Sequence, residues 1–306
     1  MRVIGAVLFA SLVACSQTER REPAVAVAPA VVEDAPEPVA EVAPPAEPAF
    51  EEITYTAWDG LGPRGCAFMA PVGNTADEID VVFHFHAGQM SDRELRASGL
   101  RAVFVSCGWG VGTAPYSNAF ADERRFEWML KTALRRAGAK RARKIALVSW
   151  SAGFASISKI LRVPRYYAMV DSVVLLDSLH SAYDARHAPD MRMLDPFVRF
   201  ARDASSDGGK AMVITHSAIV PRGYASSTEA SQAVLAAIDV PIHEADDMRF
   251  GRDSMKLDAV ADRGNLHLRG YRGTGPHDHF DHLHLVGDVL RTWVLPRWYT
   301  RGSEQR

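Results

Sequence analysis

Six short runs rich in Val, Ile and Leu, separated by stretches with helical periodicity, are the feature that most restricts what this chain can fold into. Apolar runs of this kind are typical of strands buried on both faces of a parallel sheet. Their alternation with helices predicts an α/β fold, in which a mainly parallel, doubly wound sheet is covered by helices on both faces. The expected strands are residues 79–85, 101–106, 145–149, 172–176, 211–215 and 265–270, and the expected helices are 122–137, 194–204, 228–238 and 280–295.

The predicted elements lie within residues 51–300, a length that suits one large α/β domain. Residues 240–263 are charged and show little periodicity, so they could form a loop, a short helix or part of a cap over a site. The formal net charge of −2 does not indicate a nucleic-acid-binding surface. The basic run at 135–144 ends a predicted helix, where positive charge complements the helix dipole.

The first fifteen residues contain an apolar run over 3–12 and the sequence Leu-Val-Ala-Cys at 12–15. They resemble a bacterial lipoprotein signal, which implies cleavage before Cys15 and acylation of that cysteine; an ordinary secretory signal is the alternative. The apolar run is too short to span a bilayer. Ser16 rather than Asp follows the cysteine, and the resemblance then implies the outer membrane. Residues 16–50 are rich in Ala, Pro, Glu and Val and predict a disordered tether.

Two further cysteines, Cys66 and Cys107, form an even pair if Cys15 carries lipid. A disulfide between them would suit an oxidising compartment. Pairing cannot be read from the sequence, and two separately buried thiols are the favoured interpretation.

The segment Ser-Trp-Ser-Ala-Gly at 149–153 follows an apolar strand and precedes helix-compatible sequence. A sharp strand-to-helix turn exposes a serine hydroxyl and directs backbone N–H groups at an incoming oxyanion, so Ser151 is a candidate nucleophile. With the order of elements, this segment resembles the α/β-hydrolase superfamily over residues 79–297. Ser149 departs from that family's usual pattern, which has Gly at this position.

The sequence His-Ala-Gly at 86–88 follows the first expected strand and resembles the oxyanion loop of the same superfamily. The resemblance implies that the N–H of Ala87 or Gly88 and the N–H of Ala152, the residue after the nucleophile, donate to the same oxyanion. His84 and His86 are expected to shape this loop.

The superfamily's chain order is Ser, then Asp or Glu, then His. Asp177 ends the strand at 172–176 and is the expected acid, because the strand at 211–215 ends without a carboxylate. Asp246 and Asp247 are the alternative acids. An Asp in this position could also only cap the next turn.

Four histidines, His277, His279, His282 and His284, lie together near the end of the chain. The superfamily places its base on the loop before the final helix, which favours His279, with His282 second. His279 would then take the proton of Ser151 while Asp177 orients the imidazole.

The sequence His-Asp-His-Phe-Asp-His at 277–282 also fits the zinc-binding pattern of the metallo-β-lactamase superfamily. That family carries the pattern early in its fold and needs further ligands downstream, where only His284 and Asp288 remain here. A zinc site that combines His84 or His86 with this cluster stays an alternative. A non-catalytic binding lipoprotein with the same fold is a third interpretation.

The sequence as a whole therefore predicts a serine hydrolase that cleaves an ester, with an amide as second choice, and that needs no cofactor or metal. His86, Trp150 and His216 are expected to contact substrate. The expected partners are a small-molecule or envelope-polymer ester and, through Cys15, the membrane. The oligomeric state is left open.

Overall fold

The structure is a computed structural model that describes residues 53–62, 65–206, 209–245 and 248–299. The expected signal peptide at 1–15 with Cys15, the tether at 16–50 and the alternative acids Asp246 and Asp247 lie outside the described residues. None of the described helices is long and apolar enough to cross a membrane.

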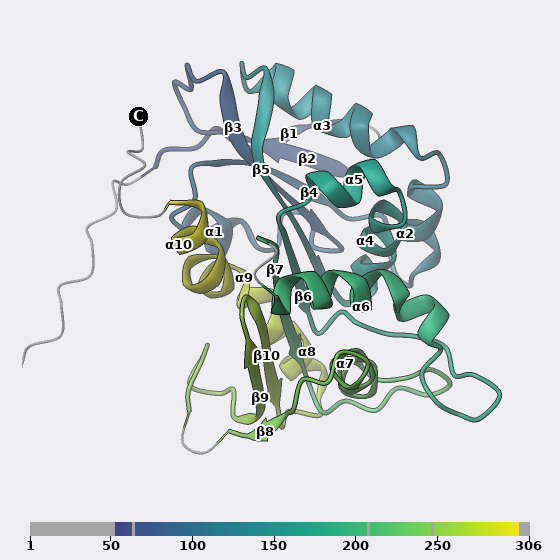
Figure 1. The fold of residues 1–306 in the computed structure, drawn as a ribbon. Helices are drawn as coiled ribbons and strands as arrows, with labels where there is room; N and C mark the ends of the chain where they lie inside the picture. The colour runs from purple at the N-terminus through teal and green to yellow at the C-terminus, as the bar shows by residue number, and fades with distance from the viewer. Residues whose placement is uncertain (1–52, 63–64, 207–208, 246–247, 300–306) are drawn as a thin grey trace, which may run out of the picture. The chain divides into compact units, whose positions relative to one another are not determined.

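The described strands form one sheet, in the spatial order β1-β2-β4-β3-β5-β6-β7-β10-β9-β8 (Figure 1). The six central strands from β4 to β10 are parallel, and the two strands at each edge pair in antiparallel fashion. The bounds are β1 (Asp59–Gly60), β2 (Cys66–Met69), β3 (Glu78–Phe85), β4 (Ala102–Cys107), β5 (Arg141–Trp150), β6 (Ser172–Leu176), β7 (Ala211–His216), β8 (His243–Glu244), β9 (Leu257–Arg263) and β10 (Leu266–Tyr271).

The six parallel strands are the six that the sequence predicts, and the expected α/β fold class is confirmed. The four strands that it does not predict are the antiparallel ones at the sheet edges. β1 and β8 have two residues each, and β9 has three exposed residues among its seven, so none of these presents a long apolar run. The unassigned segment 240–263 therefore contributes β8 and β9 to the sheet.

Helices cover both faces of the sheet (Figure 1). On one face, Val81, Phe83 and Phe85 of β3 share a core with α3, α4, α6 and α7, whereas Val82 points to the other face and packs with α1 and α9. This alternation is the period of two expected along a strand buried on both faces. The bounds are α1 (Asp92–Arg96), α2 (Ala114–Ala119), α3 (Arg124–Arg136), η1 (Ser151–Gly153), α4 (Phe154–Leu161), α5 (Pro164–Met169), α6 (Met191–Ser205), α7 (Ser227–Ala236), α8 (Pro276–His284), α9 (Val286–Val289), η2 (Leu290–Val294) and α10 (Leu295–Trp298).

The last helical segment differs from the expected helix at 280–295. It begins earlier, with Pro276 at the first helical position of α8, and it contains a π-helical turn, η2. Proline favours that first position because the N–H it lacks would have no partner there. As a result His279, expected on a preceding loop, lies inside α8.

Cys66 and Cys107 form a disulfide bond, so the favoured interpretation of two separate thiols is wrong. The two residues face each other in the register of β2 and β4, with their Cα atoms 4.1 Å apart. This pairing depends on the position of the edge strand β2, which the sequence does not predict. The bond fastens the edge of the sheet to the strand that follows β3.

Candidate active site

Three residues with unusual backbone angles follow the ends of three neighbouring parallel strands. His86 after β3, Ser151 after β5 and Asp177 after β6 have φ values of 70°, 50° and 44°. Positive φ is uncommon for residues other than glycine and costs on the order of 1–3 kcal/mol, which the surrounding contacts must offset. Strain at this one edge of the sheet marks it as a candidate site.

Ser151 is the first residue of η1, at the sharp turn directly after β5, and it is partly exposed while the two residues after it are buried. The turn requires a glycine two positions later, because a Cβ on Gly153 would overlap the carbonyl oxygen of Phe85 in β3. The small residue at the end of the Ser-x-Ser-x-Gly pattern thus has a steric cause. It lets the turn approach the neighbouring strand and holds Ser151 at the edge of the sheet.

Ser149, which stands where the superfamily usually has Gly, takes part in a buried chain of hydroxyls. Its Oγ lies 2.7 Å from Oγ of Ser178, and the Ser178 hydroxyl donates to the carbonyl oxygen of Ser151 at 2.7 Å. Because that bond uses the only hydroxyl proton of Ser178, Ser149 must be the donor in the first. The two hydroxyls therefore tie the strained turn to the residue that follows Asp177.

Asp177 is buried and accepts four hydrogen bonds. Oδ1 accepts from the N–H of Ser217 at 2.9 Å and from the hydroxyl of Ser227, and Oδ2 accepts from the Ser217 hydroxyl at 2.8 Å and from Nδ1 of His279 at 2.7 Å. Burial raises the pKa of this carboxyl, but the bond from His279, the charges of His282 and His279 and the bond from the Ser217 N–H outweigh it and hold the pKa below its ordinary value. Asp177 is therefore ionised at neutral pH.

The end of β7 supports this acid instead of supplying one. Ser217 follows β7 and provides two of the four donors, and Oγ1 of Thr215 accepts the backbone N–H of Asp177 at 3.2 Å. The absence of a carboxylate after this strand, noted in the sequence, thus coincides with a set of hydroxyls that face Asp177.

His279 lies in the first turns of α8 and is held by Trp150, the residue before Ser151. The indole N–H of Trp150 donates to the carbonyl oxygen of His279 at 2.9 Å, and the two rings stack with centroids 4.7 Å apart. Because the ionised Asp177 can only accept, Nδ1 of His279 carries the proton and Nε2 is the basic nitrogen. His279, Asp177 and Ser151 line the same cavity of about 290 Å³.

His282, the second candidate base, occupies a different position. It is completely buried, and its Nδ1 lies 2.7 Å from Oγ1 of Thr215. Burial lowers its pKa to about 4. His282 does not line the cavity of Ser151. It contacts Thr215, whose hydroxyl oxygen accepts the backbone N–H of Asp177, so its position allows it to support Asp177.

The loop after β3 contains the expected oxyanion-binding N–H groups of Ala87 and Gly88. The carbonyl oxygen of Cys107 accepts from the N–H of His86 at 2.9 Å and, weakly, from that of Gly88 at 3.5 Å. Among the described residues, the N–H of Ala87 has no hydrogen-bond partner. The N–H of Ala152 lies in the first turn of η1, where helices leave such groups unpaired. Ala87 and Ala152, ahead of Gly88, are thus the N–H groups available to an anion.

The three expected substrate contacts lie outside the lining of the Ser151 cavity. The ring of His86 packs between Tyr116 and Trp150, at centroid distances of 4.8 and 5.2 Å. His216 is buried against Gly270, where a Cβ would overlap its ring. Trp150 supports His279 through its indole N–H and its stacked ring.

Several lining residues are absent from the sequence-based prediction, because no motif marks them. Most come from the loops after β6, β7 and β10, and only the position of His180, three residues after the expected acid, offered a signal. The unpredicted lining residues are His180, Ser217, Ile219, Pro221, Tyr224, Ser227, Thr274 and Pro276.

Three of the four clustered histidines bind three different partners. His279 binds Asp177 and His282 binds Thr215, while Nδ1 of His284 lies 2.8 Å from Oε1 of Glu94. Within the described residues no group of three or more His, Cys, Asp or Glu side chains could hold a metal ion. The zinc-ligand set considered from the sequence is therefore not assembled there.

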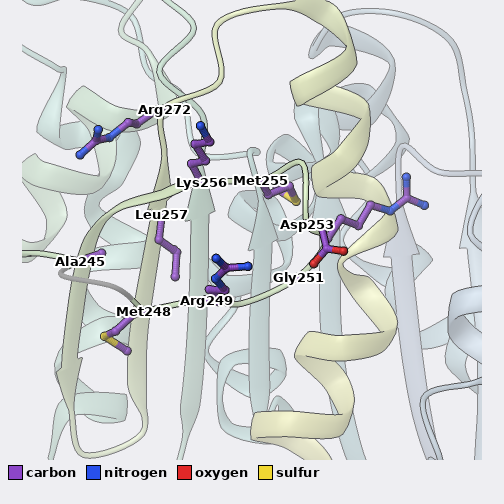
Figure 2. A pocket seen from close by; sticks show the side chains of 10 residues that line it. Ala245, Met248, Arg249, Gly251, Asp253, Met255, Lys256, Leu257 and Arg272 are labelled. Atoms are coloured by element: carbon purple, nitrogen blue, oxygen red, sulfur yellow. The ribbon is translucent and has the colours of Figure 1, made fainter.

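A larger cavity of about 760 Å³ lies along the segment that joins β8 to β9 (Figure 2). It shares no residue with the Ser151 cavity, and two of its cationic side chains already bind carboxylates: Arg272 binds Asp258 at 2.7 Å and Arg252 binds Asp281 at 3.0 Å. The side chains of Arg249, Lys256 and Arg272 point in different directions (Figure 2). This cavity lacks the convergent polar groups of the smaller one.

The hydroxyl chain predicts a measurable coupling. Ser178→Ala leaves the Ser149 hydroxyl without its partner and removes a hydrogen bond to the Ser151 carbonyl, so we expect the free energy of unfolding to fall by about 1–3 kcal/mol. Ser149→Ala combined with Ser178→Ala should cost less than the sum of the two single changes, because the unsatisfied donor is removed as well. Urea unfolding of the unmodified protein, the two single variants and the double variant measures these free energies. Strict additivity would show that the two hydroxyls do not interact.

The buried histidines predict a pH dependence of stability. Burial lowers the pKa of His282 to about 4, and burial with the charge of His86 lowers that of His84 to about 3. The unfolded chain protonates both near pH 6.5, so it binds more protons and the free energy of unfolding should decrease as the pH falls from about 6.5 to about 4. His282→Gln should reduce this slope by about 1 kcal/mol per pH unit.

Urea unfolding between pH 4 and 8 measures the slope, with His243→Gln at an exposed histidine as the control. If His243→Gln flattened the curve as much as His282→Gln, burial of His282 would not be the cause.

No protein-family model and no curated protein sequence matches this chain. Among solved structures, it resembles esterase 2 of Thermogutta terrifontis with 12% identity and a TM-score of 0.44, over 79% of this chain and 95% of that one. A thermostable esterase from Pseudomonas putida has 10% identity and a TM-score of 0.42, over 79% and 81%. Esterase B from Lactobacillus Rhamnosis has 12% identity and a TM-score of 0.39, over 62% and 72%. Likenesses this distant say nothing of activity. The strand order and the position of the Ser151 turn are those of an α/β-hydrolase fold.

Proposed function

We propose that this protein is a serine hydrolase that cleaves a carboxylic ester through an acyl-enzyme on Ser151. The observation that carries the proposal is the 2.7 Å hydrogen bond from Nδ1 of His279 to Asp177, in a cavity that both residues line together with Ser151. Ser151, His279 and Asp177 come from three separate elements and line one cavity, which supports their assignment as nucleophile, base and acid. The proposed substrate bond is an ester, with an amide as the second candidate.

In the proposed reaction, Nε2 of His279 accepts the hydroxyl proton of Ser151 while Oγ forms a bond to the carbonyl carbon of the ester. The carbonyl electron pair moves onto oxygen, where the N–H groups of Ala87 and Ala152 can stabilise the negative charge. Asp177 stays ionised and stabilises the imidazolium. Collapse of the intermediate breaks the carbon–oxygen bond to the alcohol, which leaves with the proton held by His279.

The second half of the reaction uses the same groups with water. His279 accepts a proton from water as the water oxygen attacks the acyl carbon, and it returns a proton to Oγ of Ser151 as the carboxylic acid departs. No step in this sequence requires a metal ion or an organic cofactor.

We further propose that the catalytic domain is held at the outer membrane by lipid on Cys15 through the tether at 16–50. The support is the lipobox-like sequence at 12–15 and the Ala- and Pro-rich composition that follows it. A small-molecule ester or an ester of an envelope polymer is the substrate class that such a location would make available.

A fluorophosphonate probe tests the proposed nucleophile. Ser151 attacks phosphorus and displaces fluoride, so we expect one covalent label per protein that lacks residues 1–50, and none in Ser151→Ala. Ser227→Ala, a change of another serine that lines the cavity, should still be labelled. Absence of label together with one bound zinc per chain would favour a metal-dependent hydrolase, and absence of both would favour a binding protein.

Replacement of the acid tests the role of Asp177. Asp177→Asn keeps the shape of the side chain but removes the charge that orients the imidazole, so kcat for ester hydrolysis should fall by about 10³–10⁴-fold. The cooperative urea transition should remain, which separates this loss from unfolding. Hydrolysis at the rate of the unmodified protein would exclude Asp177 as the catalytic acid and favour Asp246 or Asp247 in that role.

A further inference from the structure

The cavity that contains Ser151 is small for a ligand site. Its volume of about 290 Å³ lies just below the range of about 300–1,000 Å³ usual for sites that enclose drug-sized ligands. At the roughly 30 Å³ that one water molecule occupies in the liquid, it holds about ten non-hydrogen atoms. The three atoms of an ester group leave about seven, which the acyl chain and the nearest atoms of the alcohol must share.

The cavity also offers no free charge to a substrate. Its described lining contains no Lys, Arg or Glu, and its single Asp is Asp177, whose two oxygens already accept four hydrogen bonds. Burial lowers the pKa of His180, which keeps this ring neutral at pH 7. A carboxylate or phosphate inside the cavity would lose its water without gaining a counter-charge, which is costly.

One wall of the cavity is apolar and is fixed to a neighbouring loop. Ile219, Pro221 and Tyr224 come from the loop after β7, and the backbone N–H of Ala225 donates to the carbonyl oxygen of Ser181 in the loop after β6 at 2.9 Å. The ring of Tyr224 meets that of His180 edge to face, with centroids 5.4 Å apart. This cross-link limits how far the wall can move aside for a longer group.

We propose that the site accepts esters whose acyl group is short and uncharged, with two to about four carbons. The proposal rests on the proposed serine hydrolase function. Until the alcohol leaves, the acyl group and the alcohol occupy this cavity together, so about three of the remaining atoms are available to the acyl chain beyond the carbonyl carbon. Ile219 and Tyr224 then set the limit on chain length.

Hydrolysis of p-nitrophenyl esters from acetate to decanoate tests this limit, because the leaving group is constant along the series. We expect kcat/KM to be highest at two to four carbons and at least tenfold lower at eight, since forcing extra methylenes into a packed site is unfavourable. Ile219→Ala and Tyr224→Ala should each lower the ratio of kcat/KM for the butyrate ester to kcat/KM for the octanoate ester by at least fivefold.

Val220→Ala is the matched control, because Val220 is adjacent in sequence but 79% exposed and does not line the cavity. For Val220→Ala, the ratio of kcat/KM for the butyrate ester to that for the octanoate ester should equal the ratio of the unmodified protein. A series that rises towards octanoate, or a ratio changed equally by Ile219→Ala and Val220→Ala, would overturn the proposal.

Charge is tested with the p-nitrophenyl monoester of succinic acid against the butyrate ester, which has the same acyl chain length. We expect the succinate ester to react at least tenfold more slowly, and equal rates would contradict the uncharged cavity. Fluorophosphonate labelling of Ser151 in the same preparation keeps the two proposals apart. Labelling with a preference for long or charged esters would refute only the substrate class, whereas absence of Ser151-dependent labelling would refute the hydrolase itself.

Discussion

A single buried carboxylate, Asp177, places the strictest demand on the surrounding structure. A charge in a protein interior costs several kcal/mol unless neighbouring groups replace the water it has lost. Here the replacement comes from Ser217 after β7, Ser227 in α7 and His279 in α8. These donors follow Asp177 by 40, 50 and 102 residues and must converge on one side chain, and their convergence also brings the imidazole to the cavity of Ser151.

The parallel sheet makes this convergence possible. Parallel strands end at the same edge, so residues that follow β3, β5 and β6 become neighbours although more than sixty residues separate the first from the second. At this edge His86, Ser151 and Asp177 adopt backbone angles that cost energy. The Ser149–Ser178 hydroxyl chain and the close contact between Gly153 and Phe85 are the interactions that hold the middle turn in place. A residue that appears as a departure in the sequence, Ser149, is thus part of the support of the turn that carries Ser151.

Sequence patterns and tertiary contacts differ in which elements they reveal. The parallel strands were predictable because burial on both faces requires continuous apolar runs. The edge strands were not, since β1, β2 and β8 have only two to four residues and β9 has exposed polar residues, and the disulfide between Cys66 and Cys107 depends on β2. Likewise, the start of α8 at Pro276 moves His279 from a loop into a helix, where Trp150 fixes its carbonyl oxygen and packs on its ring.

The amino-acid sequence by itself determined the α/β class, the turn that carries Ser151, the carboxylate at the end of β6 and the cluster that supplies an imidazole, because each depends on local composition and short-range geometry. Only the tertiary structure decided that His279 and not His282 meets Asp177, that Gly88 but not Ala87 donates its N–H to Cys107, and that Tyr224 and Ile219 line the cavity. These choices depend on hydrogen bonds and packing between residues that are distant in the chain. Such contacts leave no periodic or local signal, so they exist only once the strands are side by side.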